Sequence, residues 1–354
     1  MISSIRLQQF RSYLDTKFEF GDGVNVIVGS NGSGKTNLLE AVLVAARGGS
    51  YRVADADLIH FGKEWARLDA LFDASHNRTI KLTPHGLTKK TYTIDDKQYT
   101  RLADNKKHPV VLFEPNHLLL LQGAPENRRN YLDDILEQTT PGYTSFRKNY
   151  KRVLAQRNAL LKHRNAFAHD YFPWNLRLSE LGAVIHRARS ELTAELHTQI
   201  DQLYGELSKD KKRVTVEYSG QFAAGTYESQ LLHALESNIS REIDRGFTTH
   251  GPHREDFKVL FDGVPSTLTA SRGEVRSATL ALKILELQVL ERVNGVKPLL
   301  LLDDVFSELD VTRRSALTTH LQHYQTLLTT TEADIVKDDV KKYTVISLEG
   351  ARKR

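Results

Sequence analysis

The sequence predicts an α/β protein with an inserted helical subdomain. Three observations lead to this prediction. A glycine-rich loop joins an apolar strand to a helix near the N-terminus, a long middle stretch is helical only, and short apolar strands return in the last third. Alternating strands and helices indicate an α/β sheet, whereas an uninterrupted helical stretch indicates a separate lobe. The 354 residues are enough for about two domains.

Composition is that of an ordinary soluble globular protein, with 40% apolar and 26% charged residues. There is no cysteine, which excludes a disulfide scaffold, a cysteine-ligated metal site and a cysteine nucleophile. The net charge of +5 is compatible with a polyanionic partner. No apolar run approaches the ~18 residues of a membrane-spanning helix, and no signal peptide is visible. We therefore expect a cytoplasmic protein without a membrane partner.

The first third is expected to consist mainly of strands. Residues 3–10 and 16–20 alternate apolar and polar side chains, as half-buried strands do. Residues 24–28 form a short apolar strand, and a helix with one apolar face is expected over residues 35–46. Further strands are predicted over residues 67–72, 79–82, 91–94 and 110–113.

The middle and the last third differ in pattern. Residues 125–204 have a helical apolar period, which predicts several long helices. Strands return over residues 212–218 and 257–261, and Asp262-Gly263 after the second is a hairpin signal. The remaining predictions are a helix over 273–293, a buried strand over 298–302, a helix from 311, and strands over 325–329 and 343–347. We therefore expect a head formed by residues 1–122 and 208–354, with a helical lobe over residues 123–207 between its two parts.

The glycine-rich loop matches the pattern G-x-x-x-x-G-K-[ST] in full, with GSNGSGKT over residues 29–36. Backbone N–H groups of such a loop and of the following helix bind phosphate. Lys35 would reach the β- and γ-phosphates of ATP, and the Thr36 hydroxyl would bind Mg²⁺. The alternative is a glycine-rich turn with an incidental Lys-Thr. The expected ATP-binding residues are Gly29, Ser30, Asn31, Gly32, Ser33, Gly34, Lys35 and Thr36.

A second acidic site follows the apolar residues 299–302. Asp303 fits the carboxylate that holds Mg²⁺ at the end of a neighbouring strand, so Thr36 and Asp303 are the expected metal residues. Asp304 is placed to polarise the attacking water as a general base, so we expect Lys35 and Asp304 to be catalytic. The alternative is a surface turn, in which paired aspartates are common.

Ser271 and Gly273 open the helix that precedes the Asp303 strand. Such residues at a helix start can bind a γ-phosphate through backbone N–H groups, although they are also ordinary caps. Four motifs occur in the same chain order as in ABC-type ATPases. They are the phosphate loop, this helix start, the aspartate pair and the segment SELD over residues 307–310. In that class the Ser-x-Gly segment reaches the nucleotide of the other subunit, so we expect Ser271 and Gly273 to bind ATP in trans.

Over most of its length the sequence resembles the RecF family of bacterial ATPases, which are related to SMC and Rad50 heads. The resemblance implies an ABC-type P-loop ATPase head with a mixed sheet and flanking helices. The span between Lys35 and Ser271 leaves no room for a long coiled coil, so the inserted subdomain is a short lobe. The matching segments are FRSY at 10–13, NGSGKTNLLEA at 31–41, SYR at 50–52, VLFEP at 111–115, GAPENRRNYLD at 123–133, QRNALLK at 156–162, GPHRED at 251–256 and LDDVFSELD at 302–310.

The resemblance also implies a function. RecF proteins act in recombinational gap repair, in DNA replication and in the SOS response, with RecR and RecO as partners, and help to load RecA. We expect ATP to close two subunits into a homodimer on duplex or gapped DNA without sequence recognition. Slow, DNA-stimulated hydrolysis would then release the DNA.

Two positions depart from the family pattern, and a third segment agrees with it but differs from transporter ATPases. Glu274 stands where the signature segment usually has glutamine. Asn116-His117 replaces the usual Glu-Asp after Pro115, which leaves the equivalent of the Q-loop residue unassigned. Residues 329–331 are threonines where transporter ATPases have a switch histidine, so none is expected.

A basic helical stretch lies between Glu137 and Asp170, which enclose no other acidic residue. A helix with this unbalanced charge attracts a phosphate backbone, although a charged run is more often a solvated face. The expected DNA-binding residues are Arg147, Lys148, Lys151 and Arg152. We further expect a structural role for His250 and His253, and contact between Arg11 and the nucleotide, by analogy with SMC-type heads.

Two other functional classes remain open. A nucleotide-binding subunit of an ABC transporter would share the loop and the aspartates, but the missing switch histidine and the helical insert argue against it. A non-catalytic, ATP-sensing DNA scaffold would bind Mg²⁺ at Asp303 and Asp304 without useful turnover. A nuclease-coupled ATPase is disfavoured because too few residues follow Asp304 for another domain.

Overall fold

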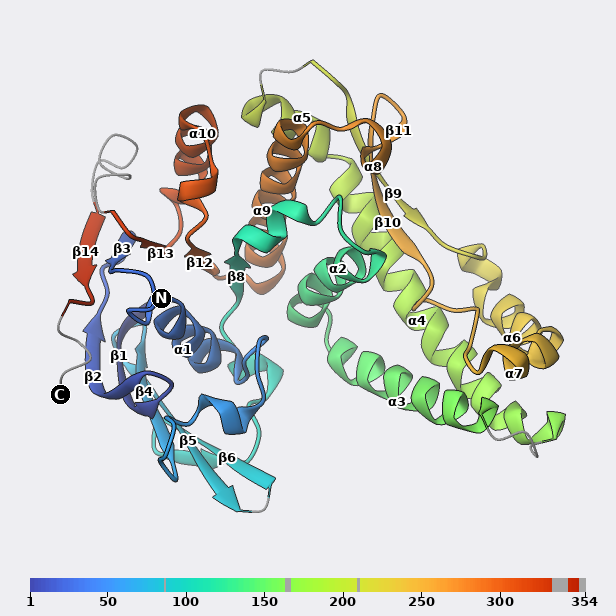
Figure 1. The fold of residues 1–354 in the computed structure, drawn as a ribbon, viewed down its shortest axis with the longest axis horizontal. Coiled ribbons are helices and arrows are strands. Elements are labelled where there is room, and N and C mark those ends of the chain that lie inside the picture. Colours follow the sequence, from blue (N-terminus) through green and yellow to red (C-terminus); the bar gives the residue numbers. More distant parts are fainter. Residues whose placement is uncertain (86, 163–166, 209–210, 333–342, 350–354) are drawn as a thin grey trace. The chain divides into compact units, whose positions relative to one another are not determined.

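The computed structural model describes residues 1–85, 87–162, 167–208, 211–332 and 343–349 (Figure 1). The chain forms two compact units. We call Met1–Leu118 together with Glu286–Arg354 the head unit, and Leu119–Leu285 the lobe unit. Among the described residues, none of the helices is long and apolar enough to cross a membrane.

The head unit contains a five-stranded sheet in which every neighbouring pair is parallel, in the order β14-β3-β13-β12-β8. The strands are β3 (Val24–Val28), β8 (Val110–Phe113), β12 (Leu299–Asp303), β13 (Thr326–Thr330) and β14 (Tyr343–Ser347). All residues of β12 and β13 are buried, as expected for parallel strands that are covered on both faces. The carboxyl ends of all five strands therefore lie along one edge of this sheet.

A second, antiparallel sheet has the order β2-β1-β4-β5-β6-β7. Its strands are β1 (Ile2–Phe10), β2 (Tyr13–Glu19), β4 (Ala66–Phe72), β5 (His76–His85), β6 (Leu87–Ile94) and β7 (Lys97–Tyr99). Alternate side chains of β4 are buried, so one face of the sheet covers the core. The buried Gln325 side chain accepts a hydrogen bond from the N–H of Ile2 and donates one to its carbonyl, both at 2.7 Å.

Helix α1 (Lys35–Arg47) packs against strands of both sheets, including β4 and β12. All residues from Leu38 to Ala46 are buried, because this segment is almost entirely leucine, valine and alanine. Gly48 ends the helix with φ of 86°, a left-handed cap that favours glycine. The other helical segments of the head unit are η1 (Asp55–Leu58), η2 (Asp104–Lys106), η6 (Phe306–Glu308) and α10 (Val311–Leu321), and η3 (Pro115–Leu119) ends at the boundary with the lobe unit.

The lobe unit is mainly helical, with α4 (Phe172–His197) packed against α3 (Tyr143–Leu161) and α6 (Tyr227–Ser237). At 26 residues, α4 is the longest helix in the described part of the chain. The other elements are α2 (Pro125–Thr139), η4 (Ala168–Tyr171), α5 (Ile200–Leu207), η5 (Ala224–Thr226), α7 (Ile239–Arg245), α8 (Ser266–Thr269) and a small antiparallel sheet of β9 (Val214–Ser219), β10 (Asp256–Phe261) and β11 (Val264–Pro265). Helix α9 (Arg272–Asn294) begins in this unit.

The α/β class and the predicted strands are confirmed, with ends shifted by a few residues. The predicted turn at Asp262-Gly263 joins β10 to β11, and both residues have positive φ, 49° and 80°. Helices α6 and α7 were not anticipated. The compact lobe unit extends to Leu285, beyond the helical lobe expected over 123–207, because β9 pairs with β10 and packs on α4.

Candidate nucleotide site

The loop between β3 and α1 has the curvature that a phosphate-binding loop needs. Gly32 and Gly34 have φ of 76° and 104°, which side-chain-bearing residues rarely adopt. A Cβ atom on Gly29 would come too close to the Ser33 side chain, so a larger residue here would force that side chain to move. The Tyr13 hydroxyl donates to the carbonyl of Gly34 at 3.0 Å and fixes the end of the loop. The sequence pattern is therefore matched by the backbone geometry.

Lys35 lies across this loop. Its Nζ donates to the carbonyls of Gly29, at 2.6 Å, and Ser30, at 3.2 Å, and the residue is 8% exposed. The ammonium thus sits beside the loop carbonyls, at the first turn of α1. From this position it can exchange carbonyl partners for phosphate oxygens.

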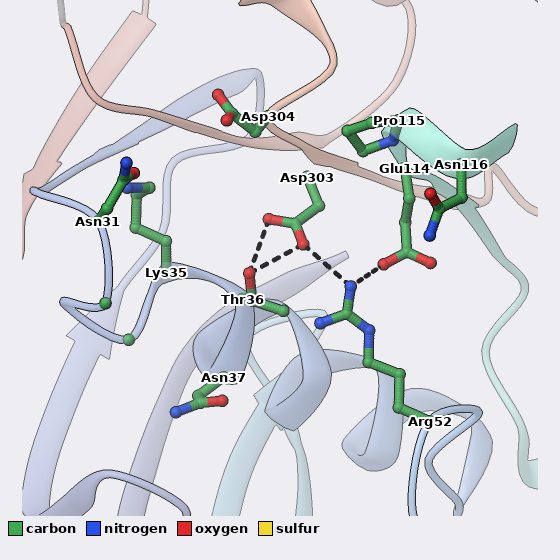
Figure 2. A pocket seen from close by; sticks show the side chains of 12 residues that line it. Asn31, Lys35, Thr36, Asn37, Arg52, Glu114, Pro115, Asn116, Asp303 and Asp304 are labelled. Atoms are coloured by element: carbon green, nitrogen blue, oxygen red, sulfur yellow. Dashed lines mark hydrogen bonds and ion pairs between the residues drawn. The ribbon is translucent and has the colours of Figure 1, made fainter. Parts of the chain in front are cut away.

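Asp303 at the end of β12 meets Thr36 at the start of α1 (Figure 2). The Thr36 hydroxyl donates to Oδ2 of Asp303 at 2.9 Å, and the Thr329 hydroxyl donates to Oδ1 at 2.8 Å. The meeting follows from the topology, because β3 and β12 are parallel and only β13 separates them. A hydroxyl and a carboxylate are the oxygen ligands that Mg²⁺ prefers, so these residues fit the metal expected from the sequence.

Asp304 follows directly with a strained backbone, at φ of 52°. Its N–H donates to the Thr329 hydroxyl at 2.9 Å, which holds the turn. Burial raises the pKa of the Asp304 carboxyl, the nearby carboxylates of Asp303 and Glu308 add to the rise, and the Ser307 hydroxyl and Lys35 oppose it. A carboxyl with a raised pKa at the edge of the cavity suits a general base.

Arg52, Tyr51 and Glu114 complete the metal side of the site, although no sequence motif assigns them a role. Arg52 forms ion pairs with Glu114 and Asp303, the latter at 3.5 Å (Figure 2). The Tyr51 hydroxyl donates to Oε1 of Glu114 at 2.5 Å. Glu114 directly follows β8, the neighbour of β12, so the rule that parallel strand ends meet could have identified it. The phosphate loop, the start of α1 and the ends of β8 and β12 line a cavity of about 430 Å³.

Ser271, which directly precedes α9, and Gly273, in its first turn, belong to the lobe unit, whereas the cavity belongs to the head unit. The N–H of Ser271 donates to Oε2 of Glu274 at 2.6 Å, and the Ser271 hydroxyl accepts from the N–H of Glu274 at 3.3 Å. These two bonds form a capping box. The ordinary capping role that the sequence left open is therefore present here.

The four expected DNA-binding residues do not share one environment. Arg147 forms ion pairs with Asp133 and Glu137, both at 2.8 Å, and its side chain is only 14% exposed. Its charge is compensated inside the lobe unit, which argues against contact between Arg147 and DNA. Lys148, Lys151 and Arg152 are exposed and lie on one side of α3. These three residues, which we call the α3 cations, remain candidates for binding the DNA backbone.

Two segments that match the RecF pattern, residues 123–133 and 251–256, contact each other inside the lobe unit. Arg128 forms a bidentate pair with Asp256, with N–O distances of 2.9 and 2.8 Å, and Arg129 donates to the carbonyl of Glu255 at 2.8 Å. His253 contacts the Tyr150 hydroxyl through Nδ1 at 2.7 Å, and burial lowers its pKa to about 4. These contacts are structural, as expected for His253.

Arg11 does not line the cavity described above. Its Nε donates to Oε2 of the buried Glu40 at 2.7 Å, and one terminal nitrogen donates to the carbonyl of Asp57 at 3.2 Å. The Ser50 hydroxyl donates to the other oxygen of Glu40 at 2.5 Å. Arg11 is thus held by the body of the head unit, which argues against the nucleotide contact expected from the sequence.

Comparison with known proteins gives a consistent result. A family model described as the RecF/RecN/SMC N terminal domain matches residues 1–353. The DNA replication and repair protein RecF of Heliobacterium modesticaldum is 34% identical over 342 residues, which cover 93% of this chain and 92% of that protein. The RecF of Streptococcus pneumoniae is 32% identical over 363 residues, 99% of this chain and 98% of that protein.

Solved structures agree with the sequence relatives. The recombination mediator protein RecF with ATPrS, of the RecFOR pathway, has a TM-score of 0.87 and 28% identity, over 98% of this chain and 95% of that one. The structure of this mediator with ATP has a TM-score of 0.82 and 29% identity, and the match covers 96% of this chain and 93% of that one. An SMC head bound to the C-winged helix domain of ScpA is similar in fold alone, with 15% identity and a TM-score of 0.54. This match covers 98% of this chain and 93% of that one. The expected ABC-type head fold is thus confirmed.

Proposed function

Because the chain belongs to the RecF family, within the RecF/RecN/SMC N-terminal domain family, we propose that it is an ATPase of the RecFOR pathway of DNA replication and repair. The observation that carries this proposal is the contact between Thr36 and Asp303, which joins the phosphate loop to the acidic strand end. Structures of RecF with ATP and ATPrS support ATP as the nucleotide. The names of the relatives give no support to the transporter alternative.

In this proposal the loop over residues 29–36 binds the phosphates through its N–H groups, and Lys35 turns from the loop carbonyls to the β- and γ-phosphates. Thr36 and Asp303 would hold Mg²⁺, which neutralises phosphate charge when bound. Asp304 orients and deprotonates the attacking water. An aspartate is shorter than the glutamate common at this position in other ABC ATPases, so slow turnover is expected.

Dimerisation is the proposed means by which ATP controls DNA binding. Two copies would close over two nucleotides, and Ser271 and Gly273 of each copy would contact the γ-phosphate held by the other. The start of α9 supports this, because N–H groups at a helix start attract anions. The γ-phosphate would take the place of the Glu274 carboxylate, which now accepts the N–H of Ser271. DNA, double-stranded or gapped, would bind the α3 cations through its backbone, without sequence reading and with stimulation of hydrolysis. RecR and RecO as partners, and loading of RecA, follow from the family alone.

The experiment is light scattering on Asp304→Asn with a fluorescent gapped duplex. With ATP and Mg²⁺, the protein mass should double from 40.2 kDa and the DNA should elute with it. Without ATP, the protein should stay at one subunit mass and bind less DNA. A monomer that ignores ATP, or DNA binding that does not depend on ATP, would contradict the proposal.

The non-catalytic scaffold predicts a different result for hydrolysis. If Asp304 is the general base, Asp304→Asn should lower the rate of phosphate release by ~10²-fold or more while nucleotide binding remains. Equal rates in the parent and the variant would favour the scaffold. The raised pKa of Asp304 supports the catalytic alternative.

A further inference from the structure

The metal side of the cavity already holds a cation, the guanidinium of Arg52. Its terminal nitrogen donates to Glu114 and lies 3.5 Å from Oδ2 of Asp303 (Figure 2). Oδ2 is also the atom that accepts the Thr36 hydroxyl, at 2.9 Å. Since Thr36 and Asp303 are the residues that fit Mg²⁺, the guanidinium and the metal approach the same carboxylate oxygen.

Glu114 binds this guanidinium more closely than Asp303 does. Its side chain is only 8% exposed, and its Oε1 accepts both Arg52 and the Tyr51 hydroxyl. The Arg52 guanidinium also lies 5.3 Å from the centre of the Tyr51 ring. A buried carboxylate with several donors holds its partner more firmly than a contact at 3.5 Å. The Tyr51–Glu114 pair therefore determines where Arg52 rests.

We propose that Glu114 is a positioning residue that retains Arg52 when Mg²⁺ takes over Asp303. The inference rests on the proposed ATP site. Two cations that face one carboxylate oxygen weaken each other's binding, so Arg52 and Mg²⁺ compete at Asp303. Glu114 draws the guanidinium away from Asp303 and reduces this competition.

The test measures how nucleotide binding depends on Mg²⁺, without measuring hydrolysis. Binding of fluorescent N-methylanthraniloyl-ATP is followed at fixed protein concentration while Mg²⁺ is varied, with one measurement in EDTA. Glu114→Gln should raise the Mg²⁺ concentration for half-maximal binding about tenfold, the effect of one charge-assisted hydrogen bond. Binding in EDTA should stay at the parental level. The double variant Glu114→Gln/Arg52→Gln lacks the competing guanidinium, so its Mg²⁺ midpoint should return towards the parental value.

Glu64→Gln is the matched control, because Glu64 is an exposed carboxylate of the same unit. It should leave the midpoint unchanged. An unchanged midpoint in Glu114→Gln, or a shift that persists in the double variant, overturns the inference. A parent protein that binds no fluorescent ATP at any Mg²⁺ concentration overturns the ATP site itself, which is a distinct result. If Glu114→Gln does not fold, Arg52→Gln alone should lower the midpoint below that of the parent, and an equal or higher midpoint overturns the inference.

Discussion

Glu274 and Ser271 cap each other at the start of α9. Each accepts a hydrogen bond from the backbone N–H of the other, at 2.6 Å and 3.3 Å. The bonds satisfy two N–H groups that a helix start leaves without a helical partner. Glu274 also pairs with Lys212 through Oε1. The glutamate that departs from the family's usual glutamine thus has a structural role in the lobe unit.

Substitution of Glu274 should separate this capping role from the role of its charge. Glu274→Gln keeps an acceptor for the N–H of Ser271, so we expect the free energy of unfolding to fall by less than about 1 kcal/mol. Glu274→Ala removes the acceptor, and the expected loss is about 1–2 kcal/mol. Urea unfolding of both variants measures the difference. Equal losses in the two variants would show that the capping hydrogen bond does not contribute to the free energy of unfolding.

Lys35→Ala should lower the affinity for ATP by ~10²-fold, because it removes the cation beside the phosphates. Fluorescent ATP titration measures the affinity, and circular dichroism checks the fold. Lys63→Ala is the matched control, since Lys63 is exposed in the same unit, and it should bind ATP like the parent. Parental affinity in Lys35→Ala would mean that the loop does not bind phosphate as proposed.

Replacement of the α3 cations (Lys148, Lys151 and Arg152) by glutamine should weaken DNA binding equally for all sequences. Each cation that contacts a phosphate adds about one unit to the slope of log affinity against log salt. The slope should therefore decrease by about 2–3 units in the triple variant. Fluorescence anisotropy at several salt concentrations measures it. An unchanged slope would place the DNA elsewhere.

Arg147 is the contrasting case on the same helix. Because it is paired with Asp133 and Glu137 inside the lobe unit, Arg147→Ala should lower the free energy of unfolding by about 3 kcal/mol. It should leave the salt slope of DNA binding unchanged. Urea unfolding and anisotropy test both statements. A stable variant with a reduced slope would restore Arg147 to the DNA-binding set.

The buried His253 makes stability depend on pH. Burial lowers its pKa to about 4, whereas a histidine in an unfolded chain titrates near ~6.5, so unfolding takes up a proton between these values. The free energy of unfolding should be greatest above about pH 6.5 and fall by up to about 1.4 kcal/mol per pH unit towards pH 4. His108 in the head unit, whose pKa burial also lowers to about 4, should add a similar dependence.

Urea unfolding between about pH 7 and pH 5 tests this dependence. His253→Gln should show a shallower fall in stability with decreasing pH than the parent. His233→Gln, which removes an exposed histidine of the same unit, should follow the parent. The same pH dependence in both variants would contradict a role for His253.

The nucleotide site could be predicted from the sequence where it is local or follows from strand ends. Residues 29–36 are contiguous, and Asp303 ends an apolar strand, so the sequence places both in the candidate site. Glu114 was not assigned, because its role depends on β8 lying next to β12, and neither periodicity nor composition specifies strand order. Knowledge of that order would have placed Glu114 beside Asp303.

The charge pattern of α3 did not distinguish paired cations from exposed ones, for a different physical reason. Arg147 and the α3 cations look alike in the sequence, but α2 packs against α3 and brings Asp133 to Arg147. Arg157 of the same helix is also paired by tertiary packing, because it is fully buried in an ion pair with Glu242 at 2.6 Å. Whether a cation is paired or exposed depends on tertiary packing, which a charge count does not contain.

The position of β3 also bears on synthesis. This strand leads into the phosphate loop, yet both of its neighbours, β13 and β14, come from residues after Leu321. While the ribosome is still making the lobe, β3 has open hydrogen-bonding edges on both sides, a state that invites aggregation. The phosphate loop is encoded early, but the strands on both sides of β3 are made late. A nascent chain that stops before β13 would therefore carry the whole loop sequence without the neighbouring strands that hold it in place.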